Sequence, residues 1–206
     1  MKRASFMAAA AAVAVGSLSV QVLAQGQGRP ASPMGSSAIE IGAKMGQDYQ
    51  RGKWIEVIYG RPILRGRDMF GSGANYGKAA SPDAPVWRAG ANQSTQLKTE
   101  VPLIINGRTV APGTYTMFVD LKPNNWTLII SSWQAQEKFD ENNKTALWGS
   151  YNYTPDKDVV RAPMTLETLP RSREQLSWEF VDVSDTGGTL VLAWGKQAAS
   201  VAFKVG

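Results

Sequence analysis

The chain of 206 residues contains no cysteine and no histidine. The missing cysteines exclude disulfide bonds, thiolate nucleophiles and cysteine-ligated zinc. The missing histidines exclude the Ser-His-Asp triad, histidine-ligated zinc or copper, and acid–base catalysis by imidazole. Catalysis in this protein would therefore depend on Asp, Glu, Lys, Tyr, Ser or Thr side chains, or on a hard metal ion bound by oxygen ligands.

Long apolar runs and dense charge blocks are also missing. After residue 24, no segment reaches the run of about 18 apolar residues that a membrane-spanning helix needs. The formal net charge of +5 is spread along the chain, without the clustered Lys and Arg of a nucleic-acid-binding surface. We therefore expect neither stable membrane insertion of the mature chain nor a nucleic-acid partner.

Residues 1–24 are typical of an export signal. Lys2 and Arg3 form a positive n-region, residues 6–15 form an Ala-rich apolar run, and small or β-branched residues precede Gln25. A buried N-terminal helix is the alternative interpretation of the same pattern. We favour a signal peptide, whose removal lowers the formal net charge to about +3 and sends the protein to the periplasm or the cell exterior.

The mature chain is predicted to consist of a flexible leader, residues 25–37, and a single β domain, residues 38–206. The leader is rich in Gly, Pro and Ser and has no apolar periodicity. The later segment 133–148 is polar, and its pattern fits either a short helix or a long loop.

Short strands follow one another closely in the β domain. Apolar side chains alternate over residues 53–60, and the dipeptide Asn106-Gly107 predicts a tight hairpin. This pattern predicts an all-β fold, an antiparallel β-sandwich or jelly-roll-like domain with long loops and little helix. Strands are expected near residues 38–42, 53–60, 95–100, 103–105, 114–119, 126–130, 158–166, 175–180, 189–194 and 199–205.

The segment from Trp87 to Thr95 combines a Trp, an Arg, a Gly, an Asn and a Thr just before a predicted strand. Its arginine can stack on an aromatic face or bind a carboxylate with two parallel hydrogen bonds. Its glycine predicts a sharp turn or a close backbone approach.

The candidate site residues are polar side chains that form either a ligand site or an internal network beneath long loops. They are Arg61, Arg67, Arg88, Asn92, Asp158 and Arg161. For Arg61 and Arg67 we favour the structural interpretation, in which each pairs with a carboxylate and holds a loop over the sheet.

Several short motifs occur in a fixed order along the β domain. They are Tyr59-x-Arg61-Pro62, Gly66-Arg67 with Phe70-Gly71, Trp87-Arg88-x-Gly90-x-Asn92-x-x-Thr95, Pro112-Gly113-Thr114-Tyr115, Asp158 with Arg161, and Trp194 before the last strand. In this order they resemble the domain-of-unknown-function family 2911, a group of exported bacterial proteins, over about residues 38–205. The resemblance implies export and a compact β domain, and it implies no particular activity.

Two functions from different classes fit the sequence. The first is a non-catalytic binding or structural module of the bacterial envelope, with an anionic or carbohydrate ligand. The second is a carboxylate-based hydrolase acting on glycans, for which Asp68, Asp158, Glu167 and Glu179 are available, although no spacing pairs any two of them. We favour the first function and assign no catalytic residue, metal ligand or cofactor. The oligomeric state stays open.

Overall fold

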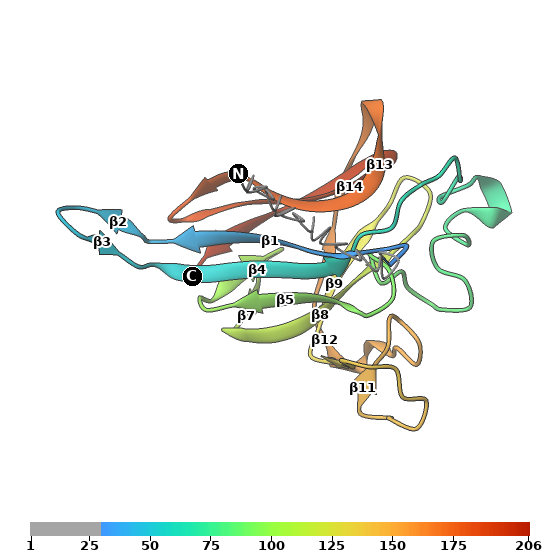
Figure 1. The fold of residues 1–206 in the computed structure, drawn as a ribbon, viewed down its shortest axis with the longest axis horizontal. Coiled ribbons are helices and arrows are strands. Elements are labelled where there is room, and N and C mark those ends of the chain that lie inside the picture. Colours follow the sequence, from blue (N-terminus) through green and yellow to red (C-terminus); the bar gives the residue numbers. More distant parts are fainter. Residues whose placement is uncertain (1–29) are drawn as a thin grey trace, which may run out of the picture.

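The computed structural model describes residues 30–206, which form two packed β-sheets (Figure 1). The expected signal peptide, residues 1–24, and residues 25–29 of the expected leader lie outside the described residues. The first sheet contains β1 (Met34–Ile41), β4 (Lys53–Gly60), β5 (Thr95–Thr99), β8 (Gly113–Asp120), β9 (Thr127–Ser131) and β12 (Asp158–Pro163), in that spatial order. Every neighbouring pair in this sheet is antiparallel.

The second sheet has four strands in the order β13-β14-β6-β7. Their bounds are β13 (Thr165–Ser184), β14 (Gly187–Val205), β6 (Leu103–Ile105) and β7 (Arg108–Val110). In Figure 1 the orange and red β13 and β14 form a layer above β1 and β4. The prediction of an all-β antiparallel sandwich with long loops and little helix is therefore confirmed.

The remaining elements of the described chain are short. A hairpin of two-residue strands, β2 (Lys44–Met45) and β3 (Tyr49–Gln50), extends the β1–β4 pair. A short parallel pair, β10 (Gln134–Ala135) and β11 (Ala146–Leu147), lies in a long loop. The only helical turns between residues 30 and 206 are η1 (Gly73–Asn75) and η2 (Pro155–Lys157). Within this part of the chain, no helix has the length and hydropathy needed to cross a bilayer.

Two element boundaries differ from expectation. β1 begins at Met34, inside the segment 25–37 that we expected to be a leader, and Met34 pairs with Gly60 of β4. This Gly- and Ser-rich segment has no apolar pattern, and backbone hydrogen bonds to β4 hold it in the sheet instead. Segment 133–148 is the long loop of the two alternatives, with the short parallel pair β10–β11 in place of a helix.

The core lies between the two sheets and is centred on an aromatic group: Phe70, Trp87, Trp126 and Trp194. The rings of Trp87 and Trp194 are stacked with centroids 6.0 Å apart, and Phe70 lies 4.7 Å from Trp126. Each such aromatic pair contributes about 0.5–1.5 kcal/mol beyond the area it buries. The tryptophan-rich composition therefore serves mainly the core.

The outer face of the first sheet is covered in part by the loop between β9 and β12, residues 132–157. Phe118 and Ile129 point outward from the sheet and pack against Leu147 and Tyr153 in a second, smaller core. The loop projects from the sheet at the lower right of Figure 1, where β11 is labelled. Its contacts place aromatic side chains beside the connection from β4 to β5, residues 61–94.

Candidate functional site

The segment from Trp87 to Thr95 is held by the sheets at both of its ends. Trp87 forms an isolated bridge to Val119 of β8, with backbone hydrogen bonds of 2.9 and 2.8 Å. The carbonyl of Ala89 accepts hydrogen bonds from Trp178 Nε1 (3.0 Å) and Thr95 Oγ1 (3.3 Å). Because these contacts come from both sheets, the segment is fixed between them and is part of the core.

Gly90 allows the close approach that the sequence predicted. A Cβ at Gly90 would lie 2.7 Å from Thr95 Oγ1 and 3.2 Å from the carbonyl oxygen of Gly60. Two nearby residues, Ala89 (φ 50°) and Asn92 (φ 62°), have left-handed backbone conformations, which asparagine adopts more readily than most residues. The run therefore folds as a tight loop that points Arg88 and Asn92 outward while Trp87 stays in the core.

Three of the candidate residues line one cavity of about 220 Å³, which we call the Arg67–Arg88 cavity. Its polar side chains are Ser32, Arg67, Arg88 and Asn92, and the stacked rings of Trp87 and Trp194 form part of its wall. The rest of the lining is small or apolar: Pro62, Met69, Ala80, Gly90 and Ala91. Among residues 30–206, no carboxylate lines this cavity.

The arginines of the cavity are held by backbone carbonyls. Arg67 donates from Nε to the carbonyl of Leu64 (3.0 Å) and from Nη2 to that of Ile63 (2.7 Å). Arg88 donates from Nη1 to the carbonyl of Asn92 (2.6 Å). Among residues 30–206 neither guanidinium has a carboxylate within ion-pair distance.

Arg61 is also bound by a backbone carbonyl, so the expected pairing of Arg61 and Arg67 with carboxylates is wrong. Nε of Arg61 donates to the carbonyl of Leu176 in β13 (3.3 Å), and the Arg61 carbonyl accepts from Gln175 Nε2 (3.3 Å). Arg61 therefore links the end of β4 to the second sheet. Backbone carbonyl oxygens, like carboxylate oxygens, accept hydrogen bonds from guanidinium groups. The pattern of side chains in a sequence does not show which carbonyls will do so.

The half-buried Arg88 packs against residues 149–151 of the β9–β12 loop. Its guanidinium carbon is 5.3 Å from the centroid of the Tyr151 ring, a cation–π contact. A Cβ at Gly149, whose φ is 63°, would lie 2.5 Å from the guanidinium carbon. Gly149 is thus required both by its own conformation and by the close packing of Arg88.

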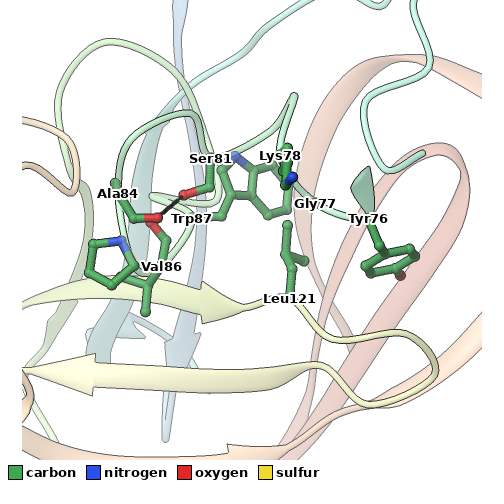
Figure 2. Close-up of a pocket in the computed structure, with 9 residues that line it drawn as sticks. Tyr76, Gly77, Lys78, Ser81, Ala84, Val86, Trp87 and Leu121 are labelled. Carbon is green, nitrogen blue, oxygen red and sulfur yellow. Dashed lines mark hydrogen bonds between the residues drawn. The ribbon is translucent and has the colours of Figure 1, made fainter. Parts of the chain in front are cut away.

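The indole of Trp87 lies between the Arg67–Arg88 cavity and a neighbouring one, and it lines both. The residue is only 1 % exposed, and its Nε1 makes no hydrogen bond among residues 30–206. No fully buried side-chain nitrogen in the described chain lacks a partner, so this Nε1 retains contact with open space. Trp87 also lines a second cavity, of about 160 Å³, shown in Figure 2 with Leu121 and with Ser81, whose hydroxyl donates to the Ala84 carbonyl.

Asp158 and Arg161 form a different cluster, outside the Arg67–Arg88 cavity. Arg161 donates to Asp158 (2.9 Å) and to Asp120 (3.1 Å), and the hydroxyl of Tyr153 donates to Asp158 (2.7 Å). Burial, and then the hydrogen bond to Asp158, raise the pKa of Tyr153 above its ordinary value of 10.0. This cluster is an internal network of the kind that we considered for the candidate residues.

Sequence reasoning did not identify four of the residues that complete these two groups. Asp120 and Tyr153 belong to the network, and Ser32 and Trp194 belong to the cavity. Tyr153 lies in an aromatic run that was visible in the sequence, whereas Ser32 was assigned to the leader. Only the fold brings residues 32 and 194 beside residue 88.

The carboxylates available to a hydrolase are partly engaged elsewhere. Asp68 accepts hydrogen bonds from the backbone N–H groups of Phe70 and Gly71, and Glu179 binds Arg173. In the described part of the chain, no group of three or more Asp and Glu side chains could hold a metal ion. Asp158 is likewise bound by Tyr153 and Arg161. Three of the four candidate acids are thus already engaged, and the hydrolase hypothesis stays a prediction.

A family model described as "Protein of unknown function (DUF2911)" matches residues 42–203 of the chain. The match contains the whole Trp87–Thr95 segment, both arginines of the cavity, and the Asp158–Arg161 pair. Comparison with curated proteins and with solved structures gave no match.

Proposed function

We propose that this chain, which belongs to the protein-of-unknown-function family DUF2911, is a non-catalytic binding module. In this proposal the Arg67–Arg88 cavity binds a ligand that carries a carboxylate or a phosphate group. The export signal expected in residues 1–24 would place the module in the bacterial envelope or outside the cell.

One observation carries the proposal: two guanidinium groups line a cavity to which the described part of the chain contributes no carboxylate. Backbone carbonyls hold both groups in place without cancelling their charge. Two like charges beside one cavity repel each other, and an anion between them would relieve that repulsion. The same carbonyl bonds limit side-chain motion, so binding would cost less conformational entropy than binding to free surface arginines.

The donors that remain are suited to a planar or tetrahedral anion. A guanidinium has five N–H donors, of which Arg67 uses two and Arg88 uses one in the hydrogen bonds described above. The free N–H groups can form paired hydrogen bonds with carboxylate or phosphate oxygens. The Asn92 amide adds a neutral donor, and the two indoles exclude water from one side of the cavity.

The test is a thermal-shift titration of the protein with sodium citrate and with sodium phosphate, at constant ionic strength set by sodium chloride. At a ligand concentration ten times Kd, binding stabilises the folded state by about 1.4 kcal/mol. For a domain of this size that corresponds to a rise of about 3–6 °C in Tm. Arg67→Ala should lose most of the rise.

Arg171→Ala is the matched control, because it removes one exposed positive charge from β13 and does not line the cavity. It should keep the full rise in Tm. If the parent protein, Arg67→Ala and Arg171→Ala all respond equally, the anions act through general salt effects and the proposed site is refuted.

A further inference from the structure

A third cavity, of about 440 Å³, lies within the β9–β12 loop and differs in chemistry from the Arg67–Arg88 cavity. Three aromatic side chains line it, Phe139, Trp148 and Tyr151, together with the charged Asp140, Glu141 and Lys144. We call it the aromatic cavity. Its volume falls in the range of ordinary small-molecule sites, about 300–1,000 Å³.

The loop that forms the aromatic cavity is ordered around one buried side chain. Gln136 is 7 % exposed, and its amide donates to the carbonyls of Asp140 (3.2 Å) and Ala146 (2.9 Å). Its Oε1 accepts from the backbone N–H of Asp140 (2.8 Å). Opposite, the Asn143 side chain accepts from the backbone N–H groups of Thr145 and Ala146. These bonds shape the cavity before any ligand arrives.

The aromatic rings of this cavity contribute little to the core. Phe139 is 57 % exposed and Tyr151 is 43 % exposed. Phe139 and Trp148 are arranged edge to face with centroids 6.0 Å apart, and the Arg88 guanidinium lies against the Tyr151 ring. The rings are therefore held in fixed orientations while much of their surface stays open to solvent.

Several polar groups around these rings have no hydrogen-bond partner within the described chain. Among residues 30–206, no hydrogen bond is made by the indole N–H of Trp148, the hydroxyl of Tyr151, the carboxylate of Glu141 or the side-chain amide of Asn152. They supply both donors and acceptors next to apolar ring faces. That combination matches a ligand with hydroxyl groups at its edge and C–H groups on its faces.

We propose that the aromatic cavity binds a neutral sugar ring of a glycan. The C–H face of a pyranose would stack on the exposed rings, as flat ligands do on aromatic platforms, and its hydroxyl groups would bind Glu141, Asn152 and the Trp148 N–H. Two carboxylates against one ammonium make the lining slightly acidic, which disfavours an anionic ligand. The site is separate from the Arg67–Arg88 cavity and does not depend on the function proposed for it.

Isothermal titration of the protein with cellotetraose, maltotetraose, tetra-N-acetylchitotetraose and free glucose tests this proposal. At least one tetrasaccharide should bind, with a change in tryptophan fluorescence from Trp148. Phe139→Ala and Tyr151→Ala should each weaken binding about tenfold. Both side chains are exposed and lie outside the two hydrophobic cores, so both variants should fold, which circular dichroism would check. Binding of glucose as strong as that of the tetrasaccharides would identify a free sugar, not a glycan segment, as the ligand.

Two variants serve as controls. Trp54→Ala removes another exposed aromatic side chain (47 % exposed), on β4 and outside the cavity, and should bind sugar as the parent does. Arg67→Ala should also bind sugar normally, so that loss of anion binding and loss of sugar binding are independent results. The proposal is overturned if none of the sugars binds below about 10 mM, if Phe139→Ala binds unchanged, or if benzyltrimethylammonium binds the cavity more tightly than any sugar.

Discussion

Replacing Arg88 with alanine removes a guanidinium that contributes only moderately to the stability of the fold. The losses are its hydrogen bond to the Asn92 carbonyl, its cation–π contact with Tyr151 and its packing against Gly149. No buried carboxylate loses its partner, because no carboxylate binds Arg88 in the described chain. The change therefore avoids the largest cost of deleting a charged residue.

The magnitude follows from these contacts. A hydrogen bond from a charged donor contributes about 1.5–3 kcal/mol when buried, and a cation–π contact at an exposed site about 0.5–1 kcal/mol. Arg88 is half-buried, so water replaces part of both interactions. We expect a loss of about 1–2 kcal/mol in the free energy of unfolding, which corresponds to a fall of about 2–8 °C in Tm.

The assay is urea unfolding followed by tryptophan fluorescence, with calorimetry for Tm. Tyr151→Ala and the Arg88→Ala/Tyr151→Ala double variant complete a cycle, whose coupling energy should be about 0.5–1 kcal/mol. A loss of about 3–5 kcal/mol would show that Arg88 completes a buried charge pair, and the carbonyl-bound description would be refuted. An unchanged midpoint would equally refute it, because the hydrogen bond of 2.6 Å to Asn92 would then contribute nothing.

Two further predictions concern single residues. The pKa of Tyr153 is raised above 10.0 by burial and by Asp158, so above pH 10 the unfolded chain releases this proton before the folded protein does, and stability should fall as pH rises. Urea unfolding between about pH 9 and 11 should show a smaller fall for Tyr153→Phe than for the parent. Gly90→Ala should cost about 1–3 kcal/mol, because its Cβ would lie 2.7 Å from Thr95 Oγ1. Gly46→Ala, with no atom nearer than 3.8 Å, should be close to neutral by the same measurement.

Local patterns predicted much of the fold. Apolar alternation over 53–60 corresponds to β4, and Asn106-Gly107 forms the β6–β7 hairpin turn with positive φ at both residues. The pattern did not predict that β13 continues for 20 residues. Its pairing with β14 shifts register between Thr168 and Arg173, and such bulges break the period of two on which the prediction depends.

The candidate site was predicted in its residue types but not in its grouping. Arg67, Arg88 and Asn92 meet in one cavity, while Asp158 and Arg161 join Asp120 and Tyr153 in another place. The bonding partners of the arginines could not be read from the sequence, because backbone carbonyls occur at every position. Which of them face a guanidinium depends on turns such as those around Leu64 and Asn92.

The Asp158–Arg161 network and the Arg67–Arg88 cavity differ in charge balance, and this difference indicates which of them is structural and which could bind a ligand. In the network, Arg161 and Lys122 face Asp120 and Asp158, so its charges cancel within the protein. The described residues that line the Arg67–Arg88 cavity carry two positive charges and no negative one. In a balanced cluster each charge is paired with an opposite charge once the protein has folded. In a cluster of like charges, only an external anion can lower the electrostatic energy further. The physical argument for a ligand site therefore applies to the cavity and not to the network, although both were assembled from the same set of predicted residues.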